Sequence, residues 1–189
     1  MIPRYKLAEL AMYLAVIASI HLTLTPLEQP SIETVQLEPI TVTAADPVAL
    51  HLYSHRWPCT GHGCADNLAI DRLADAIRYH SERLDIPIEL LVGIVMVEDP
   101  WLDTLVISTA GAVGLFQVMP MHTDAWVSCG YPLETIEGST CRGAEIIADF
   151  LHRAGSEAEA LLWYNGCQHQ YCEGYADKVN NEADLFGGE

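Results

Sequence analysis

The chain has 189 residues, of which 50% are hydrophobic and 19% are charged, so its composition is that of a globular protein and excludes a disordered one. Its length suffices for one core of about 110 to 130 residues and not comfortably for two. The formal net charge of −17 argues against nucleic-acid binding, which requires a basic surface.

The first 24 residues are typical of an export signal. Arg4 and Lys6 precede an apolar stretch that covers residues 10–24. Its length suits a cleaved signal peptide or a short uncleaved anchor, and a buried core helix is a weaker alternative. We favour the anchor slightly, because the best small-x-small cleavage site, Val42-Thr43-Ala44, lies far downstream. The prediction is a hydrophobic N-terminal helix that attaches an exported protein to a membrane.

Residues 25–65 are predicted to form an extended linker. Prolines recur through this stretch with acidic and β-branched residues between them, and no helical periodicity is visible. Residues 40–43 are rich in β-branched side chains and can add one strand to another element. The linker separates the N-terminal segment, residues 1–24, from a predicted domain at residues 66–189.

Six cysteines fall into three pairs that are local in sequence, namely Cys59 with Cys64, Cys129 with Cys141, and Cys167 with Cys172. Six cysteines allow fifteen connectivities, but these three disulfides need no chain crossing and each restrains a loop. They agree with an oxidising destination. Zinc bound with His62 or His169 is the alternative, which we disfavour because the spacings match no common finger pattern. No metal is therefore expected.

The remaining sequence is predicted to be mostly helical. Apolar periodicity and capping residues predict helices over residues 67–83 with Asp66 as N-cap, 88–98, 141–154 with Ser139 or Thr140 as cap, 157–164 and 175–184. Short helices are expected over 113–118 and 121–128, and a short strand or irregular loop over 101–109. The predicted fold class is α+β and predominantly helical.

Glu98 is the strongest candidate for a catalytic residue. It closes the apolar run of residues 90–97, and Asp99 and Pro100 end the helix directly after it. A carboxyl group there lies against hydrocarbon, beside another acid and near the negative end of a helix dipole, and each effect should raise its pKa. Such a group can deliver a proton to a leaving oxygen, as in glycoside cleavage. A solvated residue at a frayed helix end is the alternative.

Five further sequence blocks occur in a fixed order around Glu98. They are IPIELL at residues 86–91, GAVGLFQVMP at 111–120, RGA at 142–144, ALLWYNG at 160–166 and YADKV at 175–179. Their order and spacing resemble the lytic transglycosylase domain of the soluble lytic transglycosylase type. This lysozyme-like family cuts peptidoglycan. The resemblance covers residues 86–179 and implies a lysozyme-like fold for the domain.

The resemblance implies a mechanism with a single acid. Glu98 matches the catalytic residue, which protonates the oxygen of the β-1,4 bond between N-acetylmuramic acid and N-acetylglucosamine. The same carboxylate then takes the proton of the muramic 6-hydroxyl, which closes on C1 as a 1,6-anhydro ring. Neither water nor a second carboxylate is needed, which separates this reaction from ordinary glycoside hydrolysis. No cofactor is implied.

The resemblance also implies substrate-binding residues. Gln117 and Met119 match residues that bind the sugar in the cleft. Tyr164 and Asn165 match a Tyr-Asn pair whose hydroxyl group lies near the catalytic carboxyl group. Tyr175 matches a tyrosine of the last block, for which simple packing at a helix start is an equal alternative. The expected partners are peptidoglycan glycan strands and, through residues 10–24, a membrane.

Asp99 departs from the family pattern, which usually has serine there. This acid either raises the pKa of Glu98 further or supplies a second carboxylate that binds substrate or lets water compete. The alternative enzyme is therefore a hydrolytic muramidase similar to goose-type lysozyme, with Asp99, Asp103 or Asp124 positioning water.

The third alternative is a weakly active wall-binding component of a secretion, conjugation or phage assembly. The net charge of −17 should be repelled by anionic wall polymers, which suits a periplasmic location, salt-rich surroundings or delivery by such an assembly. The protein is thus expected to be periplasmic or extracellular, with anchoring to the inner membrane or association with a virion as further options.

Overall fold

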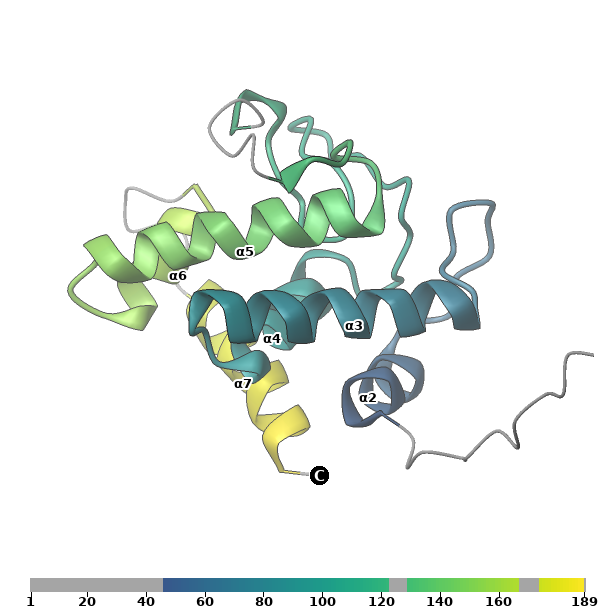
Figure 1. Ribbon diagram of the computed structural model, residues 1–189, viewed down its shortest axis with the longest axis horizontal. Helices are drawn as coiled ribbons and strands as arrows, with labels where there is room; N and C mark the ends of the chain where they lie inside the picture. The colour runs from purple at the N-terminus through teal and green to yellow at the C-terminus, as the bar shows by residue number, and fades with distance from the viewer. Residues whose placement is uncertain (1–45, 123–128, 167–173, 189) are drawn as a thin grey trace, which may run out of the picture. The chain divides into compact units, whose positions relative to one another are not determined.

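The computed structural model describes residues 46–122, 129–166 and 174–188, and these are helices joined by turns (Figure 1). The helices are α2 (Pro47–His55), α3 (Asn67–Leu84), α4 (Ile88–Glu98), α5 (Ile136–Arg153), α6 (Glu157–Tyr164) and α7 (Tyr175–Gly187). The predominantly helical character is confirmed. Of the two alternatives predicted for residues 101–109, the irregular loop is the one formed, with isolated β-bridges such as that between Ile107 and Val113.

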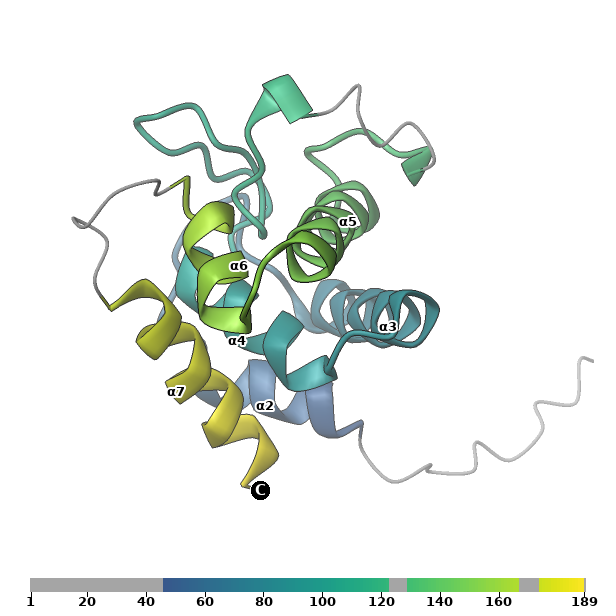
Figure 2. The same ribbon diagram turned by 90° about the vertical axis from the view of Figure 1, so that its left-hand side faces the viewer.

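The central helix α4 positions the predicted catalytic residue. Residues 90–96 are all buried, because this helix is apolar on every side and packs against both α3 and α7. Figure 2 shows α4 between these two helices. Gly93 allows the close approach of α7, since a side chain there would clash with the backbone carbonyl oxygen of Val179. Burial of α4 thus carries Glu98 to the edge of the core.

Residues 47–55, which were predicted to belong to an extended linker, form helix α2. Asp46 accepts hydrogen bonds from the backbone N–H groups of Val48, at 2.8 Å, and Ala49, at 3.3 Å, and Pro47 occupies the first turn. Val48 and Leu52 are fully buried in the core. The prediction of an extended chain is wrong here because Pro47 starts a helix, and a helix of 9 residues is too short to show clear periodicity.

Helix α5 begins earlier than predicted. Thr135, not Ser139 or Thr140, is its N-cap and accepts a hydrogen bond from the N–H of Gly138 at 3.0 Å. Ser139 lies inside the helix, and its hydroxyl oxygen accepts a hydrogen bond from the N–H of Phe116 at 3.0 Å. A residue that resembled a cap therefore fastens the segment 111–118 to α5.

The predicted helix over residues 113–118 is wrong. The backbone groups of Val113 and Val118 exchange two hydrogen bonds of 3.0 and 3.1 Å, which enclose a tight turn. Gly114 and Gln117 have φ angles of 73° and 46° within it. These left-handed conformations are incompatible with a right-handed helix, so the segment forms a compact loop beside Glu98.

Two of the three predicted disulfides are formed within the described residues. They join Cys59 to Cys64 and Cys129 to Cys141. The third predicted pair, Cys167 with Cys172, lies outside the described residues, as do Asp124, residues 1–24 and most of the linker. None of the described helices combines the length and apolar character that crossing a membrane requires.

Candidate active site

Glu98 lies at the wall of a cavity of about 270 Å³. It is the last residue of α4, and its half-buried side chain leaves the core where the helix ends. The other lining residues come from the loops at 108–122, from α5, and from the end of α6 with the turn after it: Ser108, Ala110, Ala112, Gln117, Val118, Met119, His122, Ile146, Phe150, Trp163, Tyr164, Asn165 and Gly166. The end of the buried helix therefore meets a cleft.

The carboxyl group of Glu98 has the predicted raised pKa. Burial is the main cause, and a hydrogen bond from the hydroxyl of Tyr175 to Oε1, at 2.6 Å, partly offsets it. The neighbouring acid Asp99 was also expected to raise the pKa of Glu98, but it is not among the causes of the shift. The result is a carboxyl group that favours its protonated form more than a solvated glutamate does.

The two predicted tyrosines play different parts in the structure. Tyr175 begins α7 and donates directly to Glu98, so it does more than pack. Tyr164 donates its hydroxyl proton to the backbone carbonyl of Phe116 at 2.8 Å. Burial and the negative charge of Glu98 raise the pKa of both hydroxyl groups, so both remain protonated donors.

Gln117 and Met119 lie in the cavity wall as expected. The amide nitrogen of Gln117 donates to the carbonyl of Gly114 at 2.9 Å, which holds the side chain against its own turn. Among the described residues none donates to its amide oxygen, which is thus available to a hydroxyl or N–H group in the cleft. Asn165 and Gly166 complete this side of the wall.

Asp99 lies in the core and not at the cavity. Its side chain is 1% exposed, and Oδ2 accepts a hydrogen bond from the N–H of Asp103 at 2.6 Å. Burial raises the pKa of Asp99 to about 7, against the lowering effect of nearby backbone N–H groups. Asp103 in turn accepts from the N–H of Leu105 at 2.9 Å. Both carboxyl groups thus organise the turn after α4.

Sequence reasoning missed several residues of the wall. Ile146 and Phe150 of α5 line the cavity, and neither belongs to the sequence blocks that indicated the site. The ring of Trp163 meets that of Phe150 edge to face with centroids 5.9 Å apart. Its position directly before Tyr164 is the one sequence signal that could have indicated it.

The cleft wall is fastened to α5 by close packing. The ring of Phe116 lies where a side chain at Gly143 would be, so the glycine is required for this contact. Phe116 is fully buried, and its carbonyl and N–H groups bond to Tyr164 and Ser139. Helix α5 and the loop that carries Gln117 therefore form one rigid wall opposite Glu98.

A comparison with protein-family models matches residues 75–182 to the Transglycosylase SLT domain. The matched span is more than half of the chain, and it contains Glu98, Gln117, Tyr164 and Tyr175. None of the curated proteins compared with the chain matches it.

Proposed function

Because the chain belongs to the SLT family of lytic transglycosylases, within the lysozyme-like superfamily, we propose that it cleaves peptidoglycan with Glu98 as acid and then base. The bond cut is the β-1,4 linkage between N-acetylmuramic acid and N-acetylglucosamine. The observation that carries this proposal is the half-buried carboxyl group of Glu98 at a cavity wall, with a raised pKa and a hydrogen bond from Tyr175.

In the first step Glu98 transfers its proton to the glycosidic oxygen. The bond between that oxygen and C1 of the muramic residue breaks, and the N-acetylglucosamine side leaves as an alcohol. Tyr175 supports this step because its donation to Oε1 leaves the proton on Oε2. The raised pKa supplies the protonated form at the pH where the enzyme works.

In the second step the carboxylate of Glu98 removes the proton from the 6-hydroxyl group of the muramic residue. The 6-oxygen bonds to C1, so a 1,6-anhydro ring forms and Glu98 regains its proton. No water is consumed and no other carboxylate takes part. The hydrogen bond from Tyr175 stabilises the ionised carboxylate between the two steps.

The cavity wall supplies the groups that hold the sugar. We assign Gln117 to a hydrogen bond with the glycan through its amide oxygen, and Met119 and Trp163 to apolar contacts with the sugar rings. Tyr164 positions the loop at Phe116, and Asn165 borders the cavity at the end of α6.

The positions of Asp99 and Asp103 support the proposal of ring closure over that of hydrolysis. A hydrolytic muramidase needs a second carboxylate that activates or positions water. Asp99 and Asp103 are engaged in the turn after α4 and do not line the cavity, and Asp124 lies outside the described residues. Ring closure and hydrolysis are distinguished by their products, which end in an anhydro ring and in a reducing sugar respectively.

The proposal is tested by mass spectrometry of purified peptidoglycan after digestion. The native protein should release fragments ending in 1,6-anhydro-N-acetylmuramic acid. Glu98→Gln should lower the rate by a factor on the order of 100 to 10,000, the usual contribution of a general acid. Glu89→Gln, in the first turn of the same helix and outside the cavity, is the matched control and should retain full activity.

Three outcomes would overturn parts of the proposal. Full activity in Glu98→Gln would exclude the acid role, and binding without cleavage by the native protein would indicate a wall-binding component of a larger assembly. Reducing-ended products would retain the enzyme but replace ring closure with hydrolysis.

We place the reaction outside the cytoplasm. The substrate lies there, and the two disulfides of the described residues suit an oxidising compartment. Attachment to a membrane through residues 10–24 and recruitment by a secretion, conjugation or phage assembly stay predictions, because that segment lies outside the described residues.

A further inference from the structure

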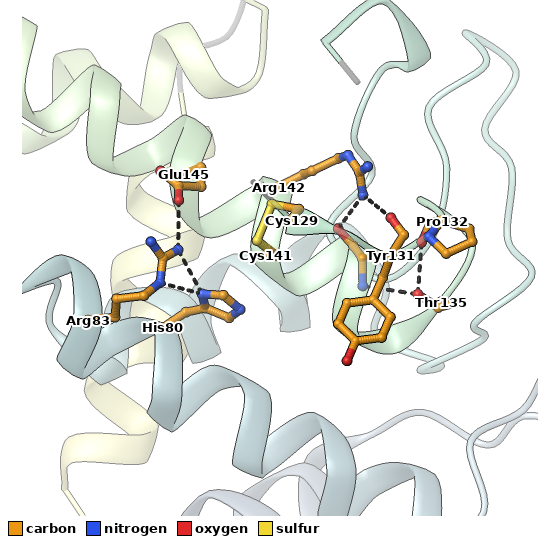
Figure 3. Close-up of a disulfide and its surroundings, with 10 residues drawn as sticks. His80, Arg83, Cys129, Tyr131, Pro132, Thr135, Cys141, Arg142 and Glu145 are labelled. Atoms are coloured by element: carbon orange, nitrogen blue, oxygen red, sulfur yellow. Dashed lines mark hydrogen bonds and ion pairs between the residues drawn. A yellow bond between two sulfur atoms is a disulfide. The ribbon is translucent and has the colours of Figure 1, made fainter. Parts of the chain in front are cut away.

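A second cavity, of about 590 Å³, lies between α3 and α5 and is called the α3–α5 groove here. Its lining includes Tyr79 of α3. It also includes His80 of α3, Cys141 of α5, and Tyr131 from the segment before α5, which Figure 3 shows. The disulfide between Cys129 and Cys141 forms part of its surface. Its volume lies within the range of small-molecule sites.

The groove and the catalytic cleft lie on opposite faces of α5. Cys141 lines the groove and Phe150 lines the cleft. These residues are separated by nine positions, about two and a half turns at 3.6 residues per turn, so they point in opposite directions. A ligand in the groove therefore does not occupy the cleft.

An ion pair closes the groove toward each end. Arg72 of α3 bonds to Glu137 of α5 at 2.6 Å, and Arg83 bonds to Glu145 at 2.7 Å. Each pair joins the two helices and presents a planar cation beside a carboxylate. Such paired groups offer both donors and acceptors, which is what the hydroxyl groups of a sugar require.

His80 is a buried donor at the groove. Its side chain is 8% exposed, and Nδ1 accepts hydrogen bonds from Arg83 at 3.0 and 3.3 Å (Figure 3). Burial and the positive charge of Arg83 lower the pKa of His80 to about 4, so the ring is neutral with its proton on Nε2. Among the described residues none accepts from Nε2. A ligand carbonyl would satisfy this N–H group.

Two exposed aromatic side chains border the groove. Tyr79 is 61% exposed and Tyr131 is 56% exposed, although both are large and partly apolar. Aromatic rings in this situation provide flat faces on which the C–H face of a sugar ring can pack. The ring of Tyr79 meets that of His80 edge to face with centroids 4.9 Å apart, which holds it beside the imidazole at the groove.

The charges of the lining exclude two other classes of ligand. Arg72 and Arg83 are offset by Asp75, Glu137 and Glu145, so the described lining of the groove has no surplus of positive charge for a phosphate or another anion. Asp75, the carboxylate without an arginine partner across the groove, pairs with Arg78 of its own helix at 3.0 Å. No strong acidic patch is left for a basic peptide. An uncharged polar ligand fits best.

We propose that the α3–α5 groove is a second glycan-binding site, which holds an N-acetylated sugar of a peptidoglycan strand away from the cleft. The acetamido carbonyl accepts from Nε2 of His80, one ring packs on Tyr79 or Tyr131, and hydroxyl groups bond to the two ion pairs. The choice of polymer rests on the proposed function, but the binding does not require cleavage. The site keeps the enzyme on the wall between cuts.

The test is a titration of the full chain carrying Glu98→Gln with soluble β-1,4-linked N-acetylglucosamine tetrasaccharide, followed by NMR. Signals of Tyr79, Tyr131 and the His80 imidazole should shift. The double variant Tyr79→Ala, Tyr131→Ala should weaken this binding about tenfold, the scale of a lost aromatic contact. Trp57→Ala, a similarly exposed aromatic outside both cavities, is the matched control and should not change it.

A second pair of variants tests the donor. His80→Gln retains a side-chain N–H group and should keep part of the affinity, whereas His80→Phe should lose it; circular dichroism checks that both fold. On insoluble peptidoglycan the double tyrosine variant of the active chain should raise KM about tenfold and leave kcat unchanged.

Shifts confined to Gln117 and Trp163 would overturn the second site, as would equal binding by the double tyrosine variant. Preference for a cationic peptide over the tetrasaccharide would also overturn it. If the protein cleaves peptidoglycan but the tetrasaccharide does not bind in the α3–α5 groove, the second site is refuted and the proposed reaction is not. If the tetrasaccharide binds in the groove but no anhydro products form, the proposed reaction is refuted and the second site is not.

Discussion

The two faces of α5 use charge in opposite ways. On the cleft face, Glu98 is the one carboxyl group among the described lining residues, and it lies at the end of a buried apolar helix with a tyrosine hydroxyl as its partner. On the groove face the acids Glu137 and Glu145 are each held by an arginine. A half-buried acid such as Glu98 has a raised pKa and is suited to proton transfer, whereas the acids paired with arginine hold the two helices together.

The same contrast separates Glu98 from its neighbour Asp99. Both pKa values are raised by burial, but Asp99 faces the turn that follows α4 and Glu98 faces a cavity. A perturbed carboxyl group is therefore functional only where substrate can reach it. The following predictions test these differences, beginning with the largest effect.

Asp99→Asn should remove a pH dependence of stability. Because the folded pKa of about 7 lies above the ordinary value of 3.8, the native protein should lose stability as pH rises from about 4 to about 7. The loss is at most about 4 kcal/mol, from 1.4 kcal/mol per pKa unit. Denaturant unfolding at several pH values measures it. Asp75→Asn, a change at an exposed acid, should keep the native slope, and an unchanged slope in Asp99→Asn would contradict the assignment.

Replacing Cys129 and Cys141 by serine should lower the free energy of unfolding by about 3 kcal/mol, since the disulfide closes a loop of 12 residues. The matched control is the Cys59–Cys64 pair, whose shorter loop of 5 residues should cost about 2 kcal/mol. The Cys129–Cys141 disulfide lines the α3–α5 groove and not the catalytic cleft. The serine variant should therefore still cleave short soluble glycans below its own melting temperature. Loss of that cleavage in the folded variant would show that the two faces are coupled.

Tyr175→Phe should move the alkaline limit of activity upward. The hydroxyl of Tyr175 lowers the pKa of Glu98, so its removal raises that pKa and the acid form survives to higher pH. The rate at the optimum should fall about tenfold, as the carboxylate loses a hydrogen bond. Tyr164→Phe is the control: its hydroxyl bonds to Phe116, so stability should fall while the pH profile stays in place. A profile that shifts toward acid in Tyr175→Phe would be inconsistent with this geometry.

Arg83→Gln should have the smallest effect on stability, about 1 kcal/mol or less, because its ion pair is partly exposed. The clearer signal is the pKa of His80, which should rise because the positive charge of Arg83 lowers it. NMR titration of the imidazole measures the change. Arg72→Gln breaks the other ion pair of the groove and should leave His80 unaffected. An unchanged His80 titration in Arg83→Gln would refute the contact.

Much of the cleft was predictable because its signals are local. The apolar run that ends at Glu98 predicted a buried helix and a carboxyl group of raised pKa, and both are confirmed. The role of Tyr175 was open, because packing and hydrogen bonding look alike in sequence. Asp99 was predicted to bind substrate because it directly follows Glu98 in the sequence. Successive side chains of a helix end diverge, and that prediction does not agree with the position of Asp99 in the core.

The sequence alone determined the helical character, the position of Glu98 and two local disulfides, since each depends on residues close together in the chain. The tertiary structure decided the rest. It placed Tyr175 on Glu98 across 77 positions and Tyr164 on Phe116 across 48, and it opened a groove between α3 and α5. Such contacts depend on how helices pack, and packing is set by the complementary shapes of distant side chains.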